Sequence, residues 1–199
     1  MKVPIFPLSG VIFFPETDLP LNIFEERYLD MIDYSLSNNR LVAMIQPLEN
    51  NQYYKIGCLG KINSFNETND KRYIINIRGI SLFNLKKEVI ENTKFKIFEI
   101  SLLENYSSSA PFSEDKFNKK ILLDRFKIFC EKNNISINFE IIDSIDSINL
   151  IKLIAMSCPF SAAEKQMLLE TKNINDMPDK IISLFEFYTN NNFLKGTVN

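Results

Sequence analysis

Val-Pro-Ile-Phe-Pro-Leu (residues 3–8) opens a segment in which short apolar runs are interrupted by prolines, at Pro4, Pro7, Pro15 and Pro20. Proline has no backbone N–H to donate, and it restricts the residue before it to extended geometry. These prolines exclude a helix from the first twenty residues, so we expect short strands and bends there. The apolar runs flanking the prolines supply the side chains that such strands would bury.

One helix is predicted directly after this segment. Five apolar residues fall at helical spacing on one face: Phe24, Tyr28, Met31, Ile32 and Leu36. Asn22 is the expected N-terminal cap, and the pair Asn38-Asn39 marks the expected end.

The rest of the first hundred residues carries strand signals, several with an apolar residue at every second position. The predicted strands cover residues 3–6, 11–14, 41–45, 54–65, 72–78, 81–86 and 94–103. A hairpin loop is expected within residues 63–71 and a tight turn at Arg78-Gly79-Ile80. Long strands joined by hairpins around one helix indicate a small antiparallel β-barrel, which removes exposed edges by closing on itself.

After residue 103 the apolar spacing becomes helical and stays so. The Ser-rich stretch at residues 104–111 is the predicted linker. Helices are expected from about residue 114 to 132 with Ser113 as cap, over 139–145, 147–157 and 162–171, and from about 178 to 190 with Asp176 as cap. The inward face predicted for the first of them consists of Phe117, Ile121, Phe126, Phe129 and Cys130. Ser161 and Glu164 form a capping-box pattern at the start of the fourth. The predicted organisation is α+β: a β-domain over residues 1–108 and an α-helical bundle over 112–199.

Composition limits the chemistry available to the chain. Its 199 residues carry a net charge of −2 and contain no histidine. The absence of histidine excludes Ser-His-Asp and Cys-His nucleophile systems and HExxH metal sites. Three widely separated cysteines, Cys58, Cys130 and Cys158, form neither a disulfide framework nor a zinc spacing, and each is expected to be a small buried hydrophobe. No cofactor and no metal is predicted.

The sequence also carries no targeting signal that we can identify. No apolar run is long enough to cross a bilayer, and the first residues lack both an apolar signal core and a cleavage site. A cytoplasmic location with no membrane contact is therefore expected.

The opening block, continued by FEERY at residues 24–28, resembles the start of the Lon protease N-terminal (substrate-binding) domain. Three later stretches resemble the same family in the same order: IGCLGKI (56–62), IRGISLF (77–83) and PFSAAEKQMLLE (159–170). The resemblance implies a PUA-like β-domain followed by a helical bundle, and a non-catalytic role in recognising polypeptide. A phosphate loop and a Ser-Lys peptidase segment are absent from the sequence, so we expect a stand-alone member of this family, bacterial and associated with proteolysis.

Two sets of residues are candidates for a role in binding or in stabilising the fold. Phe13, Phe14, Tyr53 and Tyr54 are candidates for an exposed apolar surface that binds polypeptide, by apolar contact or by strand addition. Glu25, Arg27 and Tyr28 are expected to tie the predicted helix to the barrel. As adjacent helical residues, Glu25 and Glu26 point in different directions and do not form a catalytic carboxylate pair.

The expected partners are unfolded or specific client polypeptides and, for an adaptor, a separate protease. An RNA-binding PUA-like module is an alternative, because residues 61–96 contain eight basic and four acidic side chains. Against it, the whole chain is acidic, whereas nucleic-acid-binding proteins carry a dominant basic face. An enzyme that uses carboxylates or a lysine is a further alternative, but the sequence contains no set of such residues at a spacing that suggests catalysis.

Overall fold

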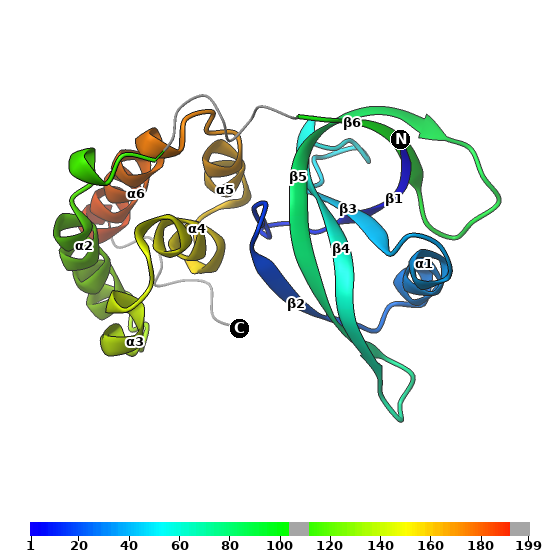
Figure 1. The fold of residues 1–199 in the computed structure, drawn as a ribbon, viewed down its shortest axis with the longest axis horizontal. Coiled ribbons are helices and arrows are strands. Elements are labelled where there is room, and N and C mark those ends of the chain that lie inside the picture. Colours follow the sequence, from blue (N-terminus) through cyan, green and yellow to red (C-terminus); the bar gives the residue numbers. More distant parts are fainter. Residues whose placement is uncertain (104–111, 192–199) are drawn as a thin grey trace. The chain divides into compact units, whose positions relative to one another are not determined.

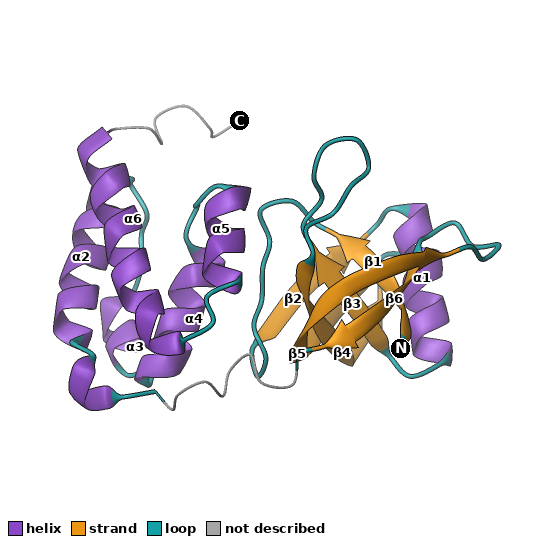
Figure 2. Ribbon diagram, turned by 90° about the horizontal axis from the view of Figure 1, so that it is seen from above, coloured by secondary structure: helices purple, strands orange, loops and turns teal. Residues whose placement is uncertain are grey.

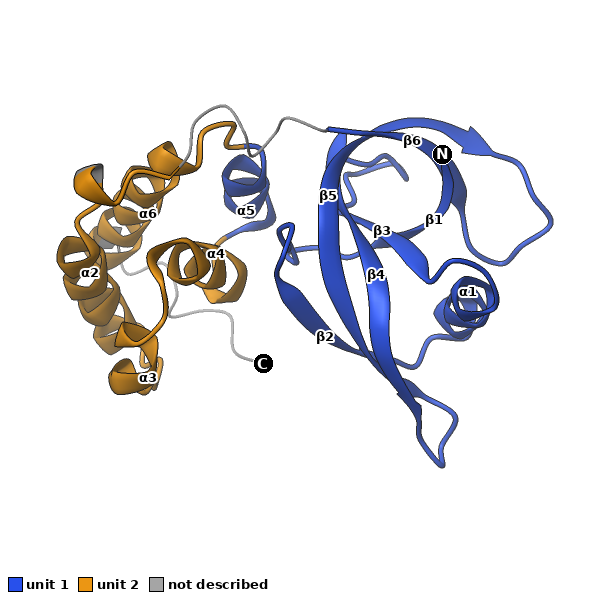
Figure 3. Ribbon diagram, viewed as in Figure 1, with its two compact units in different colours: residues 1–106, 161–170 blue, residues 107–160, 171–199 orange. Residues whose placement is uncertain are grey.

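The computed structural model describes residues 1–103 and 112–191 (Figure 1). The predicted linker at residues 104–111 lies outside these ranges. The chain divides into two compact units (Figure 3), here called the sheet unit (residues 1–106 and 161–170) and the helical unit (residues 107–160 and 171–199). The mixed sheet and the helices confirm the predicted α+β class.

The sheet unit is built on one mixed β-sheet, with helices α1 (Glu26–Ser37) and α5 (Ala162–Leu169). Its strands are β1 (Lys2–Pro7), β2 (Asp18–Ile23), β3 (Leu41–Ile45), β4 (Ile56–Glu67), β5 (Tyr73–Val89) and β6 (Ile97–Leu102). The strand order is β2-β5-β4-β3-β1-β6, and β6 also pairs with β5, so five strands close a ring. β1 and β3 run parallel, which corrects the prediction of a purely antiparallel sheet.

The long strand β5 replaces two predicted strands and the predicted turn at Gly79. Its first part pairs with β2 and its last part with β6, while β4 runs along its other edge. The Gly79 amide donates to the Thr17 carbonyl at 2.9 Å, and the Glu16 amide donates to the Gly79 carbonyl at 3.0 Å. A Cβ at Gly79 would overlap the Phe14 carbonyl oxygen, so this glycine permits close backbone approach and does not make a turn.

Helix α1 starts later than the sequence indicates. Asn22 lies in β2, so its predicted role as the cap is wrong, and Glu25 takes the cap position, although its side chain accepts no hydrogen bond from the backbone amides of the first turn. Phe24 precedes the helix and is exposed. The buried face consists of Tyr28, Met31, Ile32 and Ser35.

Helix α5 belongs to the sheet unit, whereas the predicted division placed its residues in the helical bundle. Two buried glutamines connect this helix to the strands. The Gln46 side-chain amide donates to the Ala162 carbonyl (2.8 Å) and to Oε1 of Gln166 (3.0 Å). Gln166 in turn donates to the Ile56 carbonyl at 2.9 Å. The predicted capping box of Ser161 and Glu164 is confirmed at the start of this helix.

The helical unit contains α2 (Lys119–Lys132), α3 (Phe139–Asp143), α4 (Ser147–Ser157), α6 (Met177–Asn191) and two short 3₁₀ turns, η1 (Glu114–Lys116) and η2 (Ile174–Asp176). The predicted helix from residue 114 is interrupted because Phe117 is extended, and Asn118 rather than Ser113 caps α2. Ile121, predicted to face inward, is 48% exposed, and Leu122 is buried in its place.

Aromatic packing joins α2 and α6 in the helical unit, where Figure 2 shows them side by side. Phe129 of α2 and Phe185 of α6 have ring centroids 4.8 Å apart, and Phe160 lies 5.9 Å from each. The three cysteines, Cys58, Cys130 and Cys158, are buried, as predicted.

Replacing Gln46 or Gln166 by alanine tests the attachment of α5. Each change leaves a buried hydrogen-bonding group without its partner, which costs about 1–3 kcal/mol of unfolding free energy. Because the two side chains contact each other, the double variant should be less destabilised than the sum of the single variants, as measured by urea unfolding. Additive losses would contradict a shared network, and Gln52→Ala, in the exposed part of a loop, is the control.

Candidate functional site

Tyr53 and Tyr54 lie in a compact loop that we call the tyrosine loop (residues 46–54). The Leu48 amide donates to the Gln52 carbonyl at 2.8 Å, and the Tyr54 amide donates to the Gln46 carbonyl at 3.1 Å. Asn50 and Asn51 both have φ of 56°, a left-handed conformation that asparagine tolerates better than most residues. The loop therefore has a defined turn, and the buried Gln46 anchors its base.

The tyrosine loop presents apolar surface from three side chains. Tyr53 and Tyr54 are half-buried, and Leu48 is 42% exposed. The Tyr53 ring packs edge-on against Phe98, with centroids 5.7 Å apart, and Nζ of Lys96 lies 5.7 Å from its centroid. The sequence analysis did not identify Leu48 as a candidate. In the sequence it is only a single apolar residue between Pro47 and a polar turn, which is a weak indication of a binding surface.

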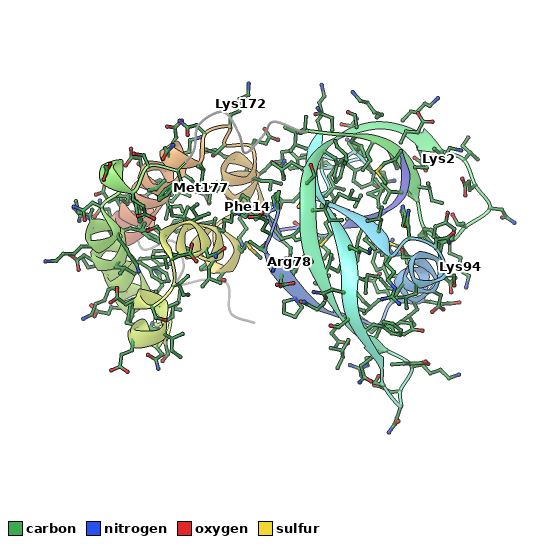
Figure 4. The ribbon with its side chains drawn as sticks, viewed as in Figure 1. Lys2, Phe14, Arg78, Lys94, Lys172 and Met177 are labelled. Carbon is green, nitrogen blue, oxygen red and sulfur yellow. The ribbon has the colours of Figure 1, made fainter. Side chains whose placement is uncertain are left out.

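Phe13 and Phe14 do not contribute to an exposed surface, so their predicted exposure is wrong. Both rings are buried, and Phe13 packs over Gly60, where an added Cβ would come within 2.8 Å of the ring. The 11–14 segment forms no strand, yet the close approach of the Phe14 carbonyl to Gly79 holds it against β5. Phe14 is labelled in Figure 4.

The structure brings Glu25, Arg27 and Tyr28 together at the start of α1. Arg27 donates to Oε2 of Glu25 through Nε (3.1 Å) and Nη2 (2.9 Å), and its guanidinium carbon lies 4.5 Å from the Tyr28 ring centroid. Tyr28 is buried against Phe6 of β1, with centroids 4.6 Å apart, and burial raises the pKa of its hydroxyl. Of these three residues, Tyr28 is the one that packs against the sheet, whereas Glu25 and Arg27 are half-exposed.

Most of the basic side chains in residues 61–96 form ion pairs. Among the residues that the structure describes, five of these side chains have acidic partners: Arg72 with Asp70, Arg78 with Asp18, Lys87 with Glu99, Lys94 with Glu26 and Asp30, and Lys96 with Glu88. Figure 4 shows Lys94 beside α1. Several of these acids lie outside the segment, so its local excess of positive charge does not form an unopposed basic face.

A polar network crosses the exposed face of β2, β5 and β4. Oδ1 of Asp18 accepts from Asn63 (3.1 Å) and Asn76 (3.0 Å), and Oδ2 accepts from Arg78 (2.5 Å). Partial burial opposes ionisation, but hydrogen bonds from Arg78, Asn76 and Asn63 outweigh it and lower the pKa of the Asp18 carboxyl. The network thus joins three strands through one carboxylate.

Two hollows lie in the helical unit, both lined by α2 and α6. The larger, of about 260 Å³, is lined by Phe112, Ser113, Phe117, Asn118, Ile121, Asn175, Pro178, Asp179 and Ile182. The smaller, of about 130 Å³, is lined by Arg125, Ile128, Phe185, Glu186, Thr189 and Asn190. Both linings mix apolar side chains with polar ones, and the ion-paired Arg125 and Glu186 belong to the lining of the smaller hollow.

Neither a metal cluster nor a membrane-spanning helix is found in the described part of the chain. Over residues 1–103 and 112–191, no three Cys, Asp or Glu side chains come together as possible metal ligands. Within the same ranges, no helix has the length and apolar character needed to cross a bilayer.

The Asp18 network predicts a pH-dependent contribution to stability. A carboxyl whose pKa is lower in the folded state stabilises the fold above its unfolded-state value of 3.8, and this contribution disappears as the pH falls through the folded-state value. Asp18→Asn should lower the unfolding free energy at pH 7 by less than about 1 kcal/mol, since the network is exposed. Thermal melts should show the difference from wild type shrinking below pH 4. Asp124→Asn, an exposed change on α2, is the control, and a difference for Asp18→Asn that is constant from pH 7 to pH 3 would contradict the assignment.

Comparison with curated proteins finds several bacterial Lon proteases. The chain is 24% identical over 197 residues to Lon protease of Buchnera aphidicola subsp. Baizongia pistaciae, covering 94% of this chain and 25% of that protein. It is 27% identical over 188 residues to Lon protease of Desulfosudis oleivorans, covering 86% and 22%. The chain therefore spans about a quarter of the length of these relatives.

Solved structures agree in fold. An N-terminal domain of Mycobacterium avium complex Lon protease aligns with a TM-score of 0.67 and 16% identity, covering 94% of this chain and 98% of that one. A Lon N-terminal domain protein from Xanthomonas campestris aligns with a TM-score of 0.64 and 18% identity, covering 92% and 98%. Residues 2–186 match the family described as the ATP-dependent protease La (LON) substrate-binding domain, and the chain belongs to that family.

Proposed function

We propose that this protein is a non-catalytic module that binds polypeptide segments. The match to the substrate-binding family over residues 2–186 carries this proposal. The composition supports it, because a chain without histidine lacks the usual general acid-base group at neutral pH. Binding of this kind needs neither a cofactor nor a metal, and we propose that it takes place in the cytoplasm.

The tyrosine loop is the proposed contact surface of the sheet unit. Leu48, Tyr53 and Tyr54 present apolar and aromatic groups, and tyrosine provides a large contact area with a polar end that stays hydrated. The T-shaped contact of Tyr53 with Phe98 and the burial of Gln46 fix the loop before any ligand arrives. A fixed apolar surface loses little conformational entropy on binding, which suits recognition of unfolded clients.

We also propose that the closed ring of the sheet unit is a PUA-like barrel, and that the helical unit is a bundle forming a separate domain beyond the boundary at residues 108–112. The pairing of β6 with both β1 and β5 supports the first proposal. The aromatic core shared by α2 and α6 supports the second.

An adaptor that delivers clients to a separate protease is a second candidate function. The relatives in which this domain makes up about a quarter of the chain are themselves proteases, which favours such a partner. RNA binding is disfavoured, because five of the eight basic residues in the 61–96 segment pair with acids.

The test is binding of a permanently unfolded probe, such as reduced and carboxymethylated α-lactalbumin, followed by fluorescence anisotropy. The double change Leu48→Ser with Tyr54→Ser should weaken binding by about tenfold, because it removes apolar area worth roughly 1–2 kcal/mol. Ile90→Ser, at a 98% exposed position in the same unit, is the matched control and should bind like wild type. No binding by wild type would overturn the function, and equal affinity for all variants would exclude the tyrosine loop. A gel shift with structured RNA at low salt should show no retardation.

A further inference from the structure

Helix α5 forms hydrogen bonds at both ends of the tyrosine loop, within the sheet unit to which Figure 3 assigns it. At the first end, the side-chain amide of Gln46 donates to the Ala162 carbonyl (2.8 Å) and to Oε1 of Gln166 (3.0 Å). Beyond the other end, two residues after Tyr54, the Ile56 carbonyl accepts from Nε2 of Gln166 at 2.9 Å. One side chain of α5 therefore contacts the residues from which the loop leaves the sheet and those at which it returns.

Both amide N–H groups of each glutamine have an acceptor in this network. The second hydrogen bond of Gln166 goes to Oε1 of Glu170 at 2.8 Å, and Oε1 of Gln46 accepts from the Gly10 amide at 2.9 Å. The two side chains are only 1% and 2% exposed, so water does not replace a partner that moves away. The network therefore favours two arrangements of α5, docked with all of these bonds or released with most of them lost.

The residues that flank α5 in the sequence are anchored in the helical unit. Phe160 lies before the N-terminal cap of α5, and its ring centroid is 5.9 Å from that of Phe129 on α2. Thr171 follows the C-terminal cap, and its hydroxyl accepts from Nζ of Lys180 on α6 at 3.0 Å. Both anchors directly adjoin the capping residues, so a displacement of either one acts on α5 without an intervening linker.

The tyrosine loop has few hydrogen bonds of its own to maintain its shape. Two backbone bonds close it, from Leu48 to Gln52 and from Tyr54 to Gln46, and two asparagines at its turn adopt the left-handed conformation. A loop whose ends are no longer held by α5 has more conformations available. A client must then order the loop as it binds, which lowers the observed affinity.

We propose that α5 is a clamp that controls binding at the tyrosine loop. When α5 is docked, the loop is fixed at both ends and binds its client tightly. When α5 is released, the loop loosens and the affinity falls. By thermodynamic linkage, a client bound to the loop must favour the docking of α5 by the same factor. This inference rests on the proposed function of the loop and adds a means of regulating it.

Hydrogen exchange in the full chain tests whether α5 orders the loop. Gln166→Met keeps a side chain of similar size but removes its hydrogen-bond donors, so the amides of Leu48 and Tyr54 should exchange about tenfold faster. Ala163→Gln, at an exposed position of the same helix, is the matched control and should leave these amides unchanged. Circular dichroism melts establish that each variant is folded.

Anisotropy with the unfolded probe tests whether the order of the loop controls binding. Gln166→Met should weaken binding by about threefold or more, because the client has to order a looser loop, and Ala163→Gln should bind like wild type. When combined with Leu48→Ser and Tyr54→Ser, Gln166→Met should have a smaller effect, since its influence passes through the loop. An equally large effect in that background would overturn the coupling.

The reverse effect is measured by hydrogen exchange in α5 while the probe is bound. An eight-residue helix is not stable alone, so exchange of its amides reports release. Saturating probe should slow exchange of the Lys165 and Glu170 amides in wild type by about threefold or more. The Lys71 amide, in the turn between β4 and β5, is the internal control and should not change. Equal exchange in α5 with and without the probe would contradict the reciprocal effect.

The remaining outcomes separate this inference from the proposed function. If wild type binds the probe but Gln166→Met changes neither loop exchange nor affinity, the clamp is excluded and the proposed function stands. If loop exchange increases while the affinity is unchanged, α5 orders the loop without controlling binding, and the inference is overturned. If wild type does not bind the probe, the proposed function fails and its control by α5 fails with it.

Discussion

One buried side chain, Gln46, connects the parts of the sheet unit that the sequence keeps far apart. Its amide nitrogen donates to α5, at the Ala162 carbonyl and at Gln166, and its amide oxygen accepts from Gly10 at 2.9 Å. Burying an amide costs free energy unless its hydrogen bonds are made, so the three partners must be in place together. The backbone of Gln46 also closes the tyrosine loop. The position of α5 and the shape of the candidate binding loop therefore depend on the same residue.

Charged side chains on the surface also pair with residues that lie far away in the sequence. Lys94 pairs with Glu26 at 2.5 Å and Asp30 at 3.1 Å, both on α1, and Asp18 pairs with Arg78 sixty residues away. Tyr73 of β5 donates to Asp33 of α1 at 2.7 Å, which, with partial burial, raises the pKa of its hydroxyl to about 12. Counting the basic and acidic residues within one segment of the sequence does not reveal pairs of this kind, because one partner lies outside the segment. The excess of positive charge in residues 61–96 is a property of the sequence and not of the folded surface.

The sequence predicted those elements whose signals are local. The capping box at Ser161 fixed the start of α5, and the bounds of α4 agree with the structure because Asp146 and Pro159 define its ends. Strand β2 was missed because Pro20 argues against a strand, yet an edge strand tolerates proline, and β2 pairs on one side only, with β5. The residues at 11–14 have strand composition, but their apolar side chains enter the core from a segment without strand pairing.

The exposure of individual apolar side chains was harder to predict than the elements. Apolar periodicity shows which side chains share a face of a helix or strand, but it does not show which part of the protein covers that face. Phe13 is therefore buried and Ile121 exposed, contrary to expectation.

Single exposed apolar side chains are normal on a protein surface and explain nothing by themselves. Ile90, which is 98% exposed on the loop after β5, is such a case. The apolar side chains of the tyrosine loop differ because Leu48, Tyr53 and Tyr54 lie close together on one loop whose turn is held by backbone hydrogen bonds. A ligand that covers the loop would bury all three side chains together, and a loop that is already ordered loses little conformational entropy in the process. The arrangement of the three side chains on one ordered loop, and not the exposure of any one of them, therefore makes this loop a candidate binding surface.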